Sequence, residues 1–94
     1  MSVVIVGGND RMEAQYKEIC KQHNCKVKVF TQMPAEFKKK IGAPDLLILF
    51  TGTVSHKMVQ SALQEAQKAN TIVSRSHSSS TCALRNILQQ HCPA

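Results

Sequence analysis

The chain has 94 residues, of which 43% are hydrophobic, and it carries a formal net charge of +6 at pH 7. This length is enough for a single domain over residues 1–94, and the hydrophobic fraction excludes a disordered chain. The apolar runs are far shorter than a membrane span, and the first residues lack the features of a signal peptide, so we expect a cytoplasmic protein with no membrane partner.

The first predicted element is a strand at residues 3–6, which are apolar and β-branched, as in a strand buried on both faces. The turn at residues 7–9 ends this strand. Asp10 is then expected to cap a helix through residue 23, with Glu13 completing a capping box. The inner face of this helix is expected to hold Met12, Tyr16, Ile19 and His23.

The middle of the chain predicts two strands with a short helix between them. Residues 25–30 alternate between apolar and polar, which is typical of an edge strand with its two lysines facing water. A short helix is expected from Pro34, with Phe37 and Ile41 on its inner side. Residues 45–50 form a second apolar run, which predicts another strand buried on both faces.

The last part of the chain predicts two helices separated by a strand. A helix follows the segment 51–58 and runs to about residue 70, with an apolar face made of Met58, Val59, Ala62, Leu63 and Ala66. A fourth strand is expected at residues 71–75, and a serine-rich loop follows at residues 76–80. The final helix, at residues 81–91, is expected to direct inward the residues Leu84, Ile87 and Leu88.

Regular alternation of strand and helix predicts an α/β fold with a small four-stranded parallel sheet and helices on both faces. Right-handed crossovers leave few topologies, and we expect the strand order 2-1-3-4 of a Rossmann-like or flavodoxin-like fold. A domain of this size buries a limited core. We therefore expect a homodimer or a higher homo-oligomer.

Parallel sheets of this kind bind ligands at the carboxyl ends of their strands, where the strand order reverses. Here that place lies between the first and third strands, and the loop after the fourth strand flanks it. The loops at these carboxyl ends are called the rim below. The candidate residues on this rim for binding a small molecule or cofactor are Gly7, Gly8, Asn9, Thr51, Thr53, Ser55, His56, Arg75 and His77.

His56 is the most distinctive of these residues. Either Ser55 or Thr53 is expected to cap the helix that follows, which places His56 in its first turn. The helix dipole disfavours a charged imidazole there, so the neutral ring remains available as a metal ligand or proton carrier.

The segments "VVIVGG", "DLLILFTGTVSH" and the closing strand with its serine loop resemble a bacterial family, domain of unknown function 2325. The matching positions are Gly7, Gly8, Arg11, Tyr16, Asp45, Ser55, His56 and Ser78 to Ser80. Some relatives are similar to haem-binding α/β proteins with an axial histidine. The resemblance thus implies haem as the cofactor and His56 as its axial metal ligand. His77 is the weaker candidate for a second ligand or a distal donor, and the propionates are expected to pair with Arg11, Arg75 or Lys57.

Three functions follow. The first is haem binding through His56 for gas or redox sensing. The second is a regulatory module that binds a phosphate-type or nucleotide-type anion through the Gly7-Gly8 and Ser76–Ser80 loops and through the backbone N–H groups at the starts of the last two helices, without a standard nucleotide motif.

The third and least expected function is a histidine-based enzyme or phosphocarrier, because Asp10 is the only acid expected near the rim. Nucleic acid is not an expected partner, because the chain has few aromatic residues for base stacking.

Overall fold

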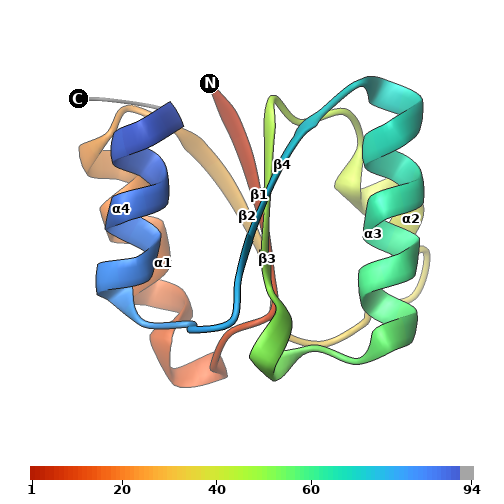
Figure 1. Cartoon of the computed structure of the whole chain (residues 1–94), viewed down its shortest axis with the longest axis horizontal. Coiled ribbons are helices and arrows are strands. Elements are labelled where there is room, and N and C mark those ends of the chain that lie inside the picture. The colour runs from red at the N-terminus through yellow and green to blue at the C-terminus, as the bar shows by residue number, and fades with distance from the viewer. Residues whose placement is uncertain (92–94) are drawn as a thin grey trace.

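Four parallel strands form the centre of the molecule, as the computed structural model of the chain shows over residues 1–91 (Figure 1). The strands are β1 (Ser2–Val6), β2 (Lys26–Phe30), β3 (Leu46–Phe50) and β4 (Ile72–Ser76). Their order in the sheet is β2-β1-β3-β4, with every neighbouring pair parallel. This order confirms the predicted 2-1-3-4 arrangement and the Rossmann-like fold class.

Helices cover both faces of this sheet (Figure 1). One face carries α1 (Glu13–Gln22) and α4 (Thr81–His91), and the other carries α2 (Phe37–Ile41) and α3 (His56–Ala69). Two short 3-10 helices, η1 (Asp10–Met12) and η2 (Thr51–Thr53), follow β1 and β3 directly. Both therefore lie at the carboxyl ends of the two central strands, where a ligand site was expected.

The hydrophobic core has two halves, one on each face of the sheet. All five residues of β3 are fully buried, and the four apolar residues of β1 are nearly so. The α1 and α4 side adds Tyr16, Ile19, Leu84 and Leu88, and the α3 side adds Met58, Ala62 and Ala66. Burial of each large apolar side chain contributes roughly 1.5–3 kcal/mol. The two central strands, which end at the rim, are therefore the most deeply buried strands of the sheet.

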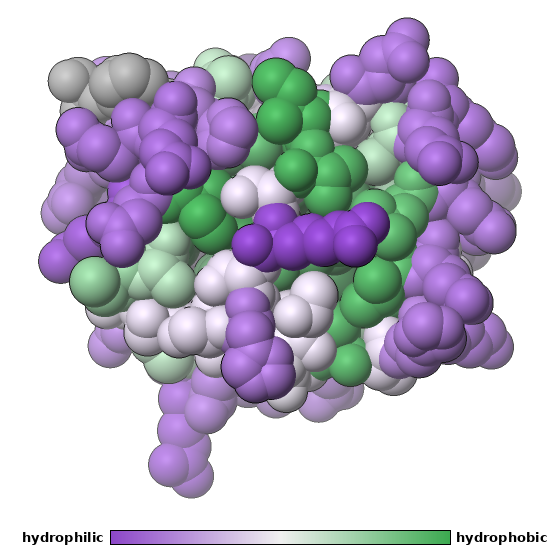
Figure 2. Space-filling view, in the orientation of Figure 1, coloured by the Kyte–Doolittle hydropathy of each residue, from purple (hydrophilic) through white to green (hydrophobic). Residues whose placement is uncertain are grey.

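The two outer edges of the sheet differ in character. On β2 the side chains of Lys26 and Lys28 are exposed, as the alternating pattern predicted. On β4 the exposed side chains are Ile72 and Arg75, and 52% of the Ile72 surface is accessible. Figure 2 shows the molecule from the β4 side, with hydrophobic surface gathered at the centre between hydrophilic flanks. Within residues 1–91, no helix has the length and apolar character needed to cross a membrane.

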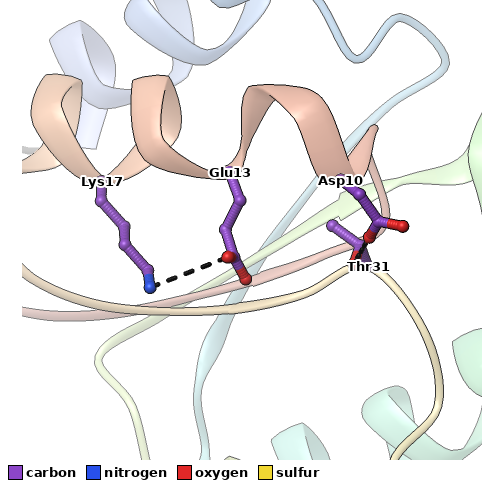
Figure 3. A network of polar contacts seen from close by, with 4 residues as sticks. All are labelled: Asp10, Glu13, Lys17 and Thr31. Carbon is purple, nitrogen blue, oxygen red and sulfur yellow. Dashed lines mark hydrogen bonds and ion pairs between the residues drawn. The ribbon is translucent and has the colours of Figure 1, made fainter.

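The predicted capping box at the start of the first helix is wrong. Asn9 caps η1, because its Oδ1 accepts the N–H of Arg11 at 2.9 Å. The side chain of Asp10 instead accepts a hydrogen bond from Thr31, which follows β2 (Figure 3). Glu13 forms an exposed ion pair with Lys17 at 3.9 Å.

The short helix α2 also begins later than predicted. It starts at Phe37 and not at Pro34, because Glu36 has a left-handed backbone with φ of 56° that interrupts the helical path. Its two inner residues, Phe37 and Ile41, are buried as expected. The boundary error therefore does not change which side chains reach the core.

Candidate functional site

Three loops meet at the carboxyl ends of the strands. The N–H of Gly8, after β1, donates to Oγ1 of Thr53 in η2 at 2.7 Å. The hydroxyl of Thr51 lies 3.5 Å from the carbonyl oxygen of Ser76 at the end of β4. Gly52 packs so closely on His77 that an added Cβ would lie 2.5 Å from the His77 carbonyl oxygen. The rim predicted from topology is therefore present, and η2 forms its centre.

The Gly7-Gly8 turn is closed by contacts within the protein. Its φ angles are +104° and +89°, which glycine adopts without strain. The N–H of Gly7 donates to the carbonyl of Phe30 at 2.8 Å, and the N–H of Gly8 donates to Thr53. The Gly8 N–H, which the anion-binding hypothesis assigned to a ligand, is thus already engaged. These glycines serve close packing of the backbone in this structure.

Polar groups of the serine loop are likewise hydrogen-bonded within the protein. The hydroxyl of Ser76 donates to the carbonyl of Ser78 at 2.8 Å. Oγ of Ser80 accepts the N–H of Ala83 at 3.1 Å and so caps α4. The hydroxyl of the buried Tyr16 donates to the carbonyl of Ser79 at 2.6 Å. This bond joins α1 to the loop across 63 positions of sequence, and no local pattern predicts it.

The start of α3 is the open part of the rim. Ser55 and not Thr53 is the N-cap, and its Oγ accepts the N–H of Met58 at 3.2 Å. The next two residues, His56 and Lys57, are exposed. The Nε2 atom of His56 lies 3.1 Å from the side-chain amide of Gln60. A histidine and a lysine therefore stand exposed in the first turn of a long helix.

The remaining candidate residues are spread over a wider area. Asn9 and Arg11 are exposed on or beside η1, and His77 is exposed against Gly52. Arg75 lies on the outer edge of β4, paired in register with Leu49. It lines a hollow of about 600 Å³ between α3 and β4. Arg75 therefore belongs to the sheet edge more than to the loops of the rim.

The acidic residues leave His56 without a carboxylate partner among residues 1–91. The carboxylate of Asp10 accepts hydrogen bonds from Thr31 and from Gln32. Asp45 lies at the opposite end of the sheet, where its Oδ2 accepts the N–H of Ser2 at 2.8 Å. A histidine that acts as general base is usually oriented by such a partner. The geometry therefore gives little support to the enzyme hypothesis.

Metal binding by a cluster of side chains finds no support in the described part of the chain. Across residues 1–91 no three or more histidine, cysteine or acidic residues are grouped to hold an ion. The rings of His56 and His77 have different neighbours, Gln60 and Gly52. Either ring could therefore supply only one ligand to a metal, and the other ligands would have to come from a cofactor such as a porphyrin.

Comparison with known proteins agrees with this fold. The family model described as "Uncharacterized protein conserved in bacteria (DUF2325)" matches residues 2–91. Among solved structures, the chain is similar to a de novo designed Rossmann fold protein with 16% sequence identity and a TM-score of 0.65. That similarity covers 99% of this chain and 97% of the designed one, and at this identity it shows the fold alone. A search of curated proteins found no match.

Proposed function

The chain belongs to the DUF2325 family, and from its own geometry we propose that it is a small binding module that holds an anionic ligand at the start of α3. This is the second of the three functions expected from the sequence. The backbone and side chains at Ser55, His56 and Lys57, at this helix start, carry this role without the Gly7-Gly8 turn. The supporting argument is electrostatic and local.

One observation carries the proposal: the first turn of α3 contains no acid and presents His56 and Lys57 instead. A helix N-terminus is equivalent to about half a positive charge, and a cation there costs roughly 0.3–1 kcal/mol. Of the other two long helices, α1 has Glu13 in its first turn, and the first turn of α4 contains neither an acid nor a lysine. An anion bound at α3 would remove this unfavourable arrangement.

The donors that an anion requires are available at the same place. The first N–H groups of a helix have no partner within the helix. The Ser55 side chain engages the N–H of Met58. The N–H groups of residues 56 and 57 thus remain at the helix start, beside the exposed Lys57 side chain. A phosphate or carboxylate group fits this arrangement of donors and charge.

Haem binding is the second candidate, and one observation favours it. His56 is exposed, so its imidazole is accessible to an axial position of iron. Lys57 and Arg11 are also exposed and could pair with propionates, which are anions. Haem would supply redox or gas-binding chemistry, while these residues would bind and orient it.

The fit to haem is incomplete in a single chain. The apolar residues that flank the site in sequence are Val54 and Val59, which are half-buried, and Met58, which is buried. His56 lines neither the hollow beside Arg75 nor the two smaller ones beside Lys28 and Arg85. An enclosed slot for a macrocycle must then come from a second surface. Phosphate-type ligands make no such demand.

Lys57→Glu is the variant that tests the anion site. We expect it to weaken inorganic phosphate or nucleoside diphosphate binding by about tenfold or more, because a carboxylate at this helix end repels the ligand. The folded state should be equally stable or slightly more stable, since the acid complements the dipole. Isothermal titration calorimetry and urea unfolding measure the two effects.

Lys26→Glu provides the matched control, because it changes the net charge equally on the exposed edge of β2. Its affinity for the same ligands should remain within about twofold of the wild type, since screened charges beyond a Debye length contribute little. Equal loss of binding in both variants, or no binding by the wild type, contradicts the proposal. Haemin binding is checked by the visible spectrum of the wild type and of His56→Ala.

A further inference from the structure

The outer edge of β4 presents unpaired backbone groups. The N–H of Ile72 donates to the carbonyl of Asp45, so Ile72 is bonded toward β3. Because the direction of these groups alternates along a strand, Ser74 is bonded toward β3 as well. The N–H and C=O groups of Val73 and Arg75 consequently point away from the sheet. They form a short template for another strand.

The surface beside this edge is hollowed and mixes apolar with polar side chains. Ile72 is 52% exposed on the α4 face of the sheet. On the α3 face, a hollow of about 600 Å³ runs along the strand. Its lining consists of Leu63, Ala66, Gln67, Asn70, Thr71, Val73 and Arg75. Figure 2 shows the hydrophobic surface on this side of the molecule, between the hydrophilic helix flanks.

The opposite edge of the sheet is protected against pairing. Two lysines of β2, Lys26 and Lys28, are exposed, and Lys17 and Lys40 line the hollow beside it. Two copies brought together there would place like charges against one another, which is a common protection of edge strands. The β4 edge has Arg75 as its single charged residue. A pairing at β4 therefore brings fewer like charges together than a pairing at β2.

We propose that β4 pairs with the β4 of a second copy of this chain, antiparallel about a two-fold axis through Ser74. Val73 then lies opposite the partner's Arg75, and the two residues exchange both of their outward hydrogen bonds. The two sheets become one continuous sheet. The same patch is used on both copies, as a two-fold interface requires.

The side chains on the α3 face suit this pairing. The apolar stem of Arg75 lies over the partner's hollow, which Leu63 and Ala66 line. The amide groups of Gln67 and Asn70 in that hollow can accept hydrogen bonds from the guanidinium.

The face that carries β4 is the broadest of the molecule, with Cα extents of 30 × 26 Å against a depth of 19 Å (Figure 1).

Ile72→Lys tests the pairing through the oligomeric state. Sedimentation equilibrium of the wild type should give twice the chain mass of 10.4 kDa. The variant places two lysines at the two-fold interface and should weaken the dimer by about tenfold or more. Met33→Lys is the matched control, because Met33 is also an exposed large hydrophobic residue, at 43%. It should remain dimeric.

A second variant guards against loss of folding. Val73→Pro removes one outward N–H of β4 and leaves the bonds to β3, as proline does at a strand edge. This variant should be monomeric, and its circular dichroism spectrum should match that of the wild type. A monomeric wild type, a dimer that persists in Val73→Pro, or equal dissociation of both lysine variants overturns the proposal.

Discussion

Gly7→Ala is expected to destabilise the protein by about 2–5 kcal/mol, which combines left-handed backbone strain with overpacking. The φ of Gly7 is +104°, and an added Cβ would lie 2.4 Å from Cγ1 of Val54. It would also lie 2.9 Å from the carbonyl oxygen of Phe50, which belongs to the central strand and cannot move aside. Urea unfolding followed by circular dichroism measures the change in free energy.

Gly42→Ala is the control that separates backbone strain from a steric clash of the added Cβ. Gly42 also has a positive φ, +64°, but an added Cβ there meets nothing within 4 Å. Its substitution should cost backbone strain only. The loss at Gly7 should therefore exceed the loss at Gly42 by at least about 1 kcal/mol. Equal losses at the two positions contradict the close packing of Gly7 against Phe50 and Val54.

Phe50→Ala is expected to reduce the free energy of unfolding by about 3–5 kcal/mol, since it empties a fully enclosed site. Phe50 is 0% exposed at the end of β3, directly below the rim. Its ring lies against Tyr16, with a centroid distance of 5.5 Å. The variant should also loosen the bond from Tyr16 to the serine loop, which a faster amide exchange in α4's first turn would reveal.

Phe50→Leu is the control that retains most of the apolar volume. It should cost less than about 1.5 kcal/mol, as volume-conserving exchanges in cores usually do. Typical domains are stable by only 5–15 kcal/mol, so the alanine variant is expected to be close to unfolding. If Phe50→Ala lowers the free energy of unfolding by less than about 1 kcal/mol, the tight packing around Phe50 at the end of β3 is contradicted.

The fold was predictable because its strands carry unambiguous patterns. The runs at residues 3–6 and 45–50 are apolar on both sides, and only central parallel strands bury both faces. Helix starts were less predictable. Asn9 and Asp10 are both good caps, and a contact of Asp10 with Thr31, 21 positions away, decided between them. Such a contact leaves no trace in local sequence.

The place of the rim was predictable from topology, but the bonds that already engage its glycine turn were not. The Gly8 N–H is engaged by Thr53, 45 positions away, and local sequence cannot reveal that bond. Strand β4 extends to Ser76, one residue beyond the predicted end, and Arg75, the last residue of the predicted strand, lies on the outer edge of the sheet. His56 and Lys57 follow Ser55 directly, and their position in the first turn of α3 was readable from the cap.

The central claim is that the start of α3 binds an anion, and an NMR titration tests it most directly. Two-dimensional ¹H–¹⁵N spectra of the labelled protein would be recorded while inorganic phosphate is added at constant ionic strength. We expect the amides of His56 and Lys57 to shift and to saturate together, while those of Gly7 and Gly8 move less. Shifts that centre on Lys26 and Lys28, or no shifts at α3, would contradict the claim.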